Sequence, residues 1–194
     1  MDTAHHILNF WFGEPRESAG EYGKERKIWF EKSPVFDQAI RERFLAAYEN
    51  ALRGTYAHWM DQPRSALALV VLLDQFPRNM FRNTARSFEA DPQALQVAQT
   101  AVARHHDQQV LPVERLFFYL PYEHSENLAH QDQAIALFEV LVQTAPELRS
   151  SLDYAYRHRD VIARFGRFPH RNACLGRAST PQESIFLQQH GSRF

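Results

Sequence analysis

The chain contains 194 residues, 44% of them hydrophobic, and a chain of this length and composition can bury a full core as one domain. Its formal net charge of −1 excludes the strongly basic surface with which proteins bind nucleic acid or anionic membranes. The longest apolar run, residues 66–73, is far shorter than the ~20 residues of a membrane-spanning helix, so we expect no membrane span.

Two further features bear on the compartment and on the ligand. The single cysteine, Cys174, cannot form an internal disulfide, and the first six residues lack the basic segment of a secretory signal, so we expect a cytoplasmic protein. Nineteen of the 22 basic residues are arginine, whose planar guanidinium suits carboxylates and phosphates. Codon usage in a GC-rich genome would explain the same excess.

Apolar periodicity predicts helices from the beginning of the chain. A short apolar segment at residues 7–12 is followed by a loop at residues 16–23 and by one or two helical turns at residues 25–30. Ser33 as the N-cap, with a proline after it, begins a strongly periodic helix at residues 34–52.

The next helix, from residue 63, contains the apolar run and continues into Asp74. An element that is apolar on every side belongs in the centre of a fold, so its charged end lies deep and needs a partner. Pro77 is expected to end or kink this helix just before it.

The rest of the chain is predicted to be helical as well. The expected helices lie at residues 91–107, 112–120, 126–144, 146–165 and 181–189. Pro121 is expected to stop the second of these, Gly166 the fourth, and a capping box from Thr180 to Glu183 begins the last. The sequence therefore predicts one all-α domain over residues 1–194, with about eight helices stacked as antiparallel hairpins.

Polar residues gather in three segments that interrupt or end helices, at residues 74–82, 119–126 and 165–177. Aromatic neighbours in these segments would hold the polar side chains against the core. The candidate residues are Asp74, Arg78 and Arg82 in the first segment, Tyr119, His124 and Glu126 in the second, and His158, Arg167, His170, Arg171 and Asn172 in or after the last long helix.

We hypothesise that these segments form the walls of one pocket for a small anionic ligand. Arginine grips carboxylates and phosphates, while histidine and carboxylate side chains transfer protons. The ligand-binding role is assigned to Arg78, Arg82, Arg167, Arg171, Asn172, His158 and Tyr119, and the catalytic role to Asp74, His124, Glu126 and His170. The cofactor is unknown. His124 and Glu126 could also serve as metal ligands, but the absence of His-Glu-x-x-His and Glu-x-x-His pairs favours no metal site.

Two alternatives stay open at this point. In the first, the polar clusters are structural: Asp74 and Arg78 form a buried ion pair, Ser125 caps a helix, and His158 is a hydrogen-bonded core residue. In the second, the helices form a scaffold whose groove binds a peptide of a partner protein. Whether the pocket only binds its ligand or also acts on it is open too.

Four motifs together resemble one known family. They are Trp11-Phe12-Gly13, Leu73-Asp-Gln-Phe-Pro-Arg-Asn79 with Arg82, Leu120-Pro-Tyr-Glu-His-Ser-Glu126, and Phe165-Gly-Arg-Phe-Pro-His-Arg-Asn172 with Leu175-Gly-Arg177. Over nearly its whole length the chain is similar to the bacterial family catalogued as domain of unknown function 924. The resemblance implies an all-helical, tetratricopeptide-like fold, and it implies no activity and no catalytic residues.

Overall fold

The computed structural model describes residues 3–14 and 22–192, and all regular structure in these ranges is helical. The α-helices are α1 (Thr3–Phe12), α2 (Pro34–Leu52), α3 (Pro63–Val70), α4 (Phe76–Met80), α5 (Asp91–Ala103), α6 (Pro112–Glu123), α7 (Leu128–Thr144), α8 (Arg149–Phe165) and α9 (Pro181–Phe186). A π turn, Val71–Gln75, joins α3 and α4 into one unbroken run, so the described part of the chain holds eight separate α-helices. The predicted all-α fold is confirmed.

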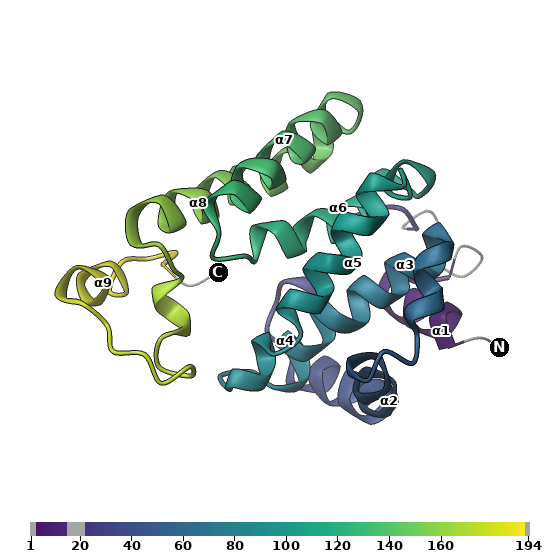
Figure 1. The fold of residues 1–194 in the computed structure, drawn as a ribbon, viewed down its shortest axis with the longest axis horizontal. Coiled ribbons are helices and arrows are strands. Elements are labelled where there is room, and N and C mark those ends of the chain that lie inside the picture. Colours follow the sequence, from purple (N-terminus) through teal and green to yellow (C-terminus); the bar gives the residue numbers. More distant parts are fainter. Residues whose placement is uncertain (1–2, 15–21, 193–194) are drawn as a thin grey trace.

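The run from α3 to α4 lies at the centre of the fold, as its uniformly apolar sequence predicts (Figure 1). Residues 66–77 are all buried. Helices α1, α5 and α6 pack around α3, and α2 packs along α4. Aromatic rings fill the centre; those of Trp11 on α1 and Phe117 on α6 meet edge to face with their centroids 5.7 Å apart.

Of the end or kink expected just before Pro77, the end is wrong: the helix continues past the proline, with a widened turn directly before it. Proline lacks the N–H that would continue the α-helical ladder, and its ring crowds the preceding turn. The structure meets this constraint with the wider π turn, in which the Phe76 N–H donates to the Val71 carbonyl, and the helix then continues to Met80. Asp74 is thereby placed inside the widened turn and not at a helix end.

The prediction that Pro121 stops its helix is also wrong, because α6 continues to Glu123. Pro121 lies in the last turn, where a proline removes only one hydrogen bond. The His124 N–H still donates to the Leu120 carbonyl at 2.8 Å and closes the turn. His124 therefore follows a complete helix directly, and its position is fixed by that helix.

Several predicted helix ends agree with the structure. The Ser33 hydroxyl accepts from the Phe36 N–H at 3.3 Å at the start of α2, and the capping box from Thr180 begins α9. Gly166, with φ of 68°, ends α8.

Other boundaries differ from the prediction. Helix α5 ends at Ala103 and not near residue 107, because His105 adopts a left-handed φ of 56°. Asn127, not Ser125, caps α7, and α9 ends at Phe186. The expected turns at residues 25–30 are a single 3-10 turn, Lys27–Trp29, and most of the loop expected at 16–23 lies outside the described residues.

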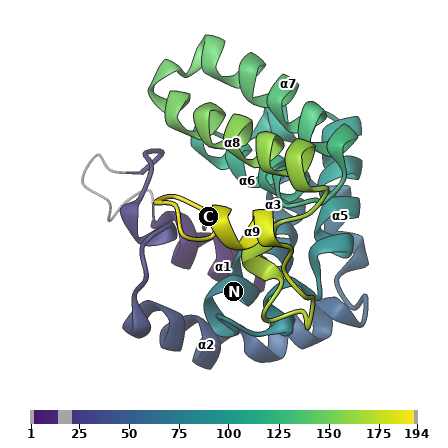
Figure 2. The ribbon, with the colours of Figure 1, turned by 90° about the vertical axis from the view of Figure 1, so that its left-hand side faces the viewer.

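Helix α7 packs along both α6 and α8, and these helices are joined by short connections. Such pairing is compatible with the tetratricopeptide-like arrangement, which stays a prediction. The C-terminal segment (residues 166–192) then leaves this layer and crosses one side of the molecule (Figure 2). Its apolar contacts form a small cluster centred on Phe168, separate from the large core. In the described ranges no helix has the length and apolar character to cross a membrane.

Candidate functional site

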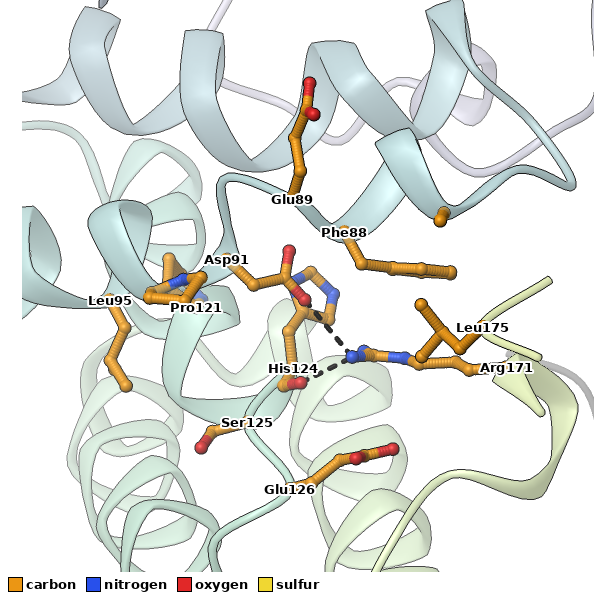
Figure 3. Close-up of a pocket in the computed structure, with 12 residues that line it drawn as sticks. Phe88, Glu89, Asp91, Leu95, Pro121, His124, Ser125, Glu126, Arg171 and Leu175 are labelled. Atoms are coloured by element: carbon orange, nitrogen blue, oxygen red, sulfur yellow. Dashed lines mark hydrogen bonds and ion pairs between the residues drawn. The ribbon is translucent and has the colours of Figure 1, made fainter. Parts of the chain in front are cut away.

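A cavity of about 380 Å³ lies where three distant parts of the chain meet (Figure 3). One wall comes from residues 85–95, at the start of α5; a second from residues 121–126, at the end of α6; and a third from residues 171–175 of the C-terminal segment. The apolar lining residues are Ala85, Phe88, Pro92, Leu95, Pro121 and Leu175, and the polar ones are Glu89, Asp91, His124, Ser125, Glu126 and Arg171.

His124 is held from behind by Asp74, which has no exposed surface. The His124 Nδ1 lies 2.7 Å from the Asp74 Oδ1, and Gln75 donates to the other carboxylate oxygen. Burial opposes the ionisation of Asp74, but Arg78, His124 and Gln75 together lower its pKa to about 2. Because an ionised carboxylate only accepts hydrogen bonds, Nδ1 of His124 carries the proton and Nε2 carries the lone pair.

The charge state of His124 follows from its surroundings. Burial and then the nearby Arg78 guanidinium lower the pKa of His124 by more than Asp74 raises it. Its imidazole is therefore neutral at pH 7, and its side chain keeps 14% of its surface exposed.

Asp91 connects the two arginines of the site. Its Oδ1 lies 2.9 Å from the Arg78 Nη1, and its Oδ2 lies 3.1 Å from the Arg171 Nη1. As the first residue of α5, its carboxylate also lies at the positive end of that helix. From the sequence, Asp91 is only a helix start, because an Asp-Pro pair at such a position says nothing about distant arginines.

Arg171 is fixed on several sides and is only 8% exposed. Its guanidinium lies over the rings of Phe88 and Phe168, at 4.5 and 4.6 Å from their centroids, and its Nη2 donates to the His124 carbonyl at 3.0 Å (Figure 3). Burial lowers the pKa of Arg171 to about 10, so the side chain is charged at pH 7. Its Nε has no hydrogen-bond partner among the described residues, and neither has the Nη2 of Arg78.

Glu126 lines the cavity, but its carboxylate is engaged with the C-terminal segment. Both of its oxygens accept from Arg177, at 2.7 and 2.9 Å, and one also accepts from the Phe168 N–H at 2.8 Å. Burial opposes its ionisation, but these bonds, led by that from Arg177, lower the pKa of Glu126. The residue therefore fastens the third wall to the second.

Two further predicted histidines lie beside the cavity without lining it. His158 on α8 pairs with the buried Glu123 at 3.0 Å, and its ring centroid is 6.5 Å from that of His124. His170 lies against Phe168, and burial followed by the positive charge of Arg171 lowers the pKa of His170 to about 3.

The structure thus brings Asp74, Arg78, His124 and Arg171 into one connected group. The remaining predicted residues pair elsewhere: Arg82 with Asp37 on α2, Arg167 with Glu183 on α9, Asn172 with Glu183 and Ser179, and Tyr119 with Asp107 and Arg115. In the described part of the chain, no three His, Cys, Asp or Glu side chains are arranged to hold a metal ion.

Among the lining residues that the sequence did not indicate, Asp91 and Phe88 contact the arginines of the site. Phe88 lies against both arginines, with its centroid 4.5 Å from the Arg171 guanidinium and 5.8 Å from that of Arg78. An isolated phenylalanine is most simply interpreted as a core residue. The pairing of a Phe and an Asp three residues apart, just before a helix, was the only available indication.

The fold and the site define an all-helical protein with a small cavity at the ends of its helices. By sequence, the chain belongs to the family described as bacterial protein of unknown function (DUF924), which matches residues 7–191. It is also similar to the solved structure of a protein of unknown function, ATU0120 from Agrobacterium tumefaciens. The two share 40% identity and a TM-score of 0.81 over 95% of this chain and 96% of the other. No curated protein matches the sequence.

Proposed function

We propose that the cavity binds a small molecule that carries one carboxylate on a short apolar body. The observation that carries this proposal is Arg171: a charged guanidinium, 8% exposed, lines the cavity with its Nε unsatisfied among the described residues. A volume of about 380 Å³ lies at the low end of the ~300–1,000 Å³ found for small-molecule sites. The mostly apolar lining suits a hydrocarbon body.

The same lining favours a carboxylate over a phosphate. Glu89, Asp91 and Glu126 all line the cavity, and their negative charges repel an anion in proportion to its charge. A single negative charge meets less repulsion, and a planar carboxylate suits a guanidinium edge.

The two alternatives make different demands on the molecule. A peptide groove would be open and extended, whereas this cavity has room only for a small ligand. A purely structural network would pair every buried charge, and much of this one is paired. The unsatisfied Nε of Arg171, a residue that lines the cavity, favours a ligand over that network.

The first prediction concerns stabilisation by butyrate, the probe for such a ligand. Butyrate at ten times its dissociation constant should raise the free energy of unfolding by about 1.4 kcal/mol. For a chain of this length the melting temperature should rise by about 3–5 °C. The melting temperature is measured against chloride at equal ionic strength.

Two variants provide the control. Arg171→Gln should lose the butyrate effect, whereas Arg167→Gln should keep it, because Arg167 pairs with Glu183 outside the cavity. Each variant removes one arginine–carboxylate pair from the C-terminal segment, so they are matched. The unaltered chain gives a second criterion, since phosphate should stabilise it less than butyrate. Equal shifts in both variants, or none in the unaltered chain, contradict the proposal.

A further inference from the structure

His124 lines the cavity, and one nitrogen of its ring is not engaged by the described residues. Its Nδ1 is bound to Asp74 at 2.7 Å and its carbonyl to Arg171, while Nε2 has no hydrogen bond with any described residue. A carboxylate that orients an imidazole through Nδ1 leaves Nε2 ready to accept a proton. The binding of an inert carboxylate has no need of this arrangement.

We propose that His124 is a catalytic base and that the carboxylate bound in the cavity is the product of the hydrolysis of a small carboxylic ester. This inference rests on the proposed function and names its substrate class. In it Asp74 is a positioning residue, which fixes the tautomer of His124, and Arg171 holds the negative charge that develops on the acyl group.

The reaction balances with water as the second reactant. Nε2 of His124 takes a proton from water while the water oxygen forms a bond to the acyl carbon. The bond from that carbon to the alcohol oxygen then breaks, and the alcohol leaves with the proton from Nε2. The acid formed loses its proton to solvent, and its carboxylate meets the guanidinium of Arg171.

Water is the nucleophile because no serine in the described ranges is bound to the base. Ser125 lines the cavity, but its hydroxyl pairs with the His130 Nδ1 at 2.9 Å and accepts from the Asn127 N–H. Neither bond involves Nε2 of His124. A Ser–His–Asp triad is therefore not assembled here, and the Asp–His pair acts directly on water.

The charges around His124 keep it in the basic form. The titratable and charged groups that face it are Asp74 and Arg78 from the α3–α4 run, Asp91 from α5, His158 from α8, and His170 and Arg171 from the C-terminal segment. Burial and then the Arg78 guanidinium disfavour a positive imidazole, by more than Asp74 and Asp91 favour it. The positive charge of Arg171, which lines the cavity, favours the anionic transition state of ester hydrolysis.

The second prediction is hydrolysis of p-nitrophenyl butyrate by the intact chain. Removing the base in His124→Gln should lower the butyrate-inhibitable rate about 100-fold or more. Asp74→Asn should lower it as well, because the amide N–H donates to Nδ1 and places the proton on Nε2. His190→Gln, which alters an exposed histidine, should leave the rate unchanged and accounts for surface imidazoles. Release of p-nitrophenolate is followed by absorbance.

A measurement on the unaltered chain covers the case in which those variants fail to fold. The rate should rise with pH through the lowered pKa of His124 and reach a plateau by about pH 7. A rate that keeps rising in proportion to hydroxide, or an undiminished rate in folded His124→Gln, overturns the inference. Butyrate binding without hydrolysis would overturn it too and leave the proposed function intact; loss of both would remove both.

Discussion

Asp74 shows how one fully buried carboxylate can make stability depend on pH. Its pKa in the folded chain is about 2, below the ordinary value of 3.8. A lowered carboxylate pKa stabilises the fold at pH values above the ordinary pKa, and this stabilisation is lost as the pH falls through the folded value. For Asp74 the window runs from about pH 4 down to about pH 2.

The third prediction follows from that window. Between pH 4 and pH 2 the ionisation of Asp74 should account for a loss of roughly 2 kcal/mol in the free energy of unfolding. Asp74→Asn should be less stable at neutral pH but should lack this component, so the two stability curves converge at low pH. Urea unfolding at half-unit pH intervals measures the difference. Parallel curves would show that Asp74 is not the group responsible.

At the residue scale, the sequence indicated part of the candidate site. Asp74, Arg78, His124 and Arg171 could be singled out because each lies at a break or end of a helix among apolar neighbours. The sequence could not separate Arg171 from Arg167, since their partners, Asp91 and Glu183, are brought to them only by the folded chain. Local pattern identifies a polar residue that needs a partner; tertiary packing decides which partner it finds.

At the element scale, Gly166 controls the turn from α8 into the C-terminal segment. It adopts a φ of 68°, which residues other than glycine and asparagine rarely adopt. A Cβ placed there would meet nothing within 4 Å, so a substitution would act through backbone strain alone.

The fourth prediction compares two substitutions at this glycine. Gly166→Ala should lower the free energy of unfolding by about 1 kcal/mol, and Gly166→Asn should cost less because asparagine tolerates the left-handed region. Chemical denaturation of both variants gives the comparison. Equal and larger losses would point to a steric conflict that the structure does not contain.

Helix existence could be predicted from the sequence, but the effect of the two internal prolines could not. Periodicity, N-caps and the left-handed glycine identified α2, the end of α8 and the start of α9. Pro77 was expected to end or kink its helix and Pro121 to end its own, and both prolines lie inside helices. A prediction from local sequence considers only the backbone hydrogen bond that each proline removes. Packing of the surrounding apolar side chains outweighs the loss of that bond, and at Pro77 the π turn also accommodates the proline ring.

At the scale of the whole molecule, ion pairs attach the C-terminal segment to the helical body. Arg177 binds Glu126 and Arg171 binds Asp91, whereas the apolar cluster around Phe168 is small. The sequence predicted the all-α class, but it could not predict that this segment returns to cover the start of α5. That return depends on pairs about 50 and 80 residues apart in the chain.

The fifth prediction tests this attachment. Arg177→Gln should weaken the docking of the segment by about 1–2 kcal/mol, because it leaves the partly buried Glu126 with fewer partners. Amide hydrogens at residues 168–192 should then exchange roughly 5- to 30-fold faster, while those of α3 keep their protection. An even increase over the whole chain would instead mean that the pair stabilises the entire fold.

Because the cavity has walls from three parts of the chain, the helical body and the cavity form at different times during synthesis. The ribosome releases α1 to α6 first, and these helices contain most of the large core. At that stage His124 can already meet Asp74, and Asp91 can meet Arg78, but Phe88 still lacks the guanidinium of Arg171. A nascent chain therefore acquires its body before its candidate site, which is complete only when residues 171–175 of the third wall have emerged.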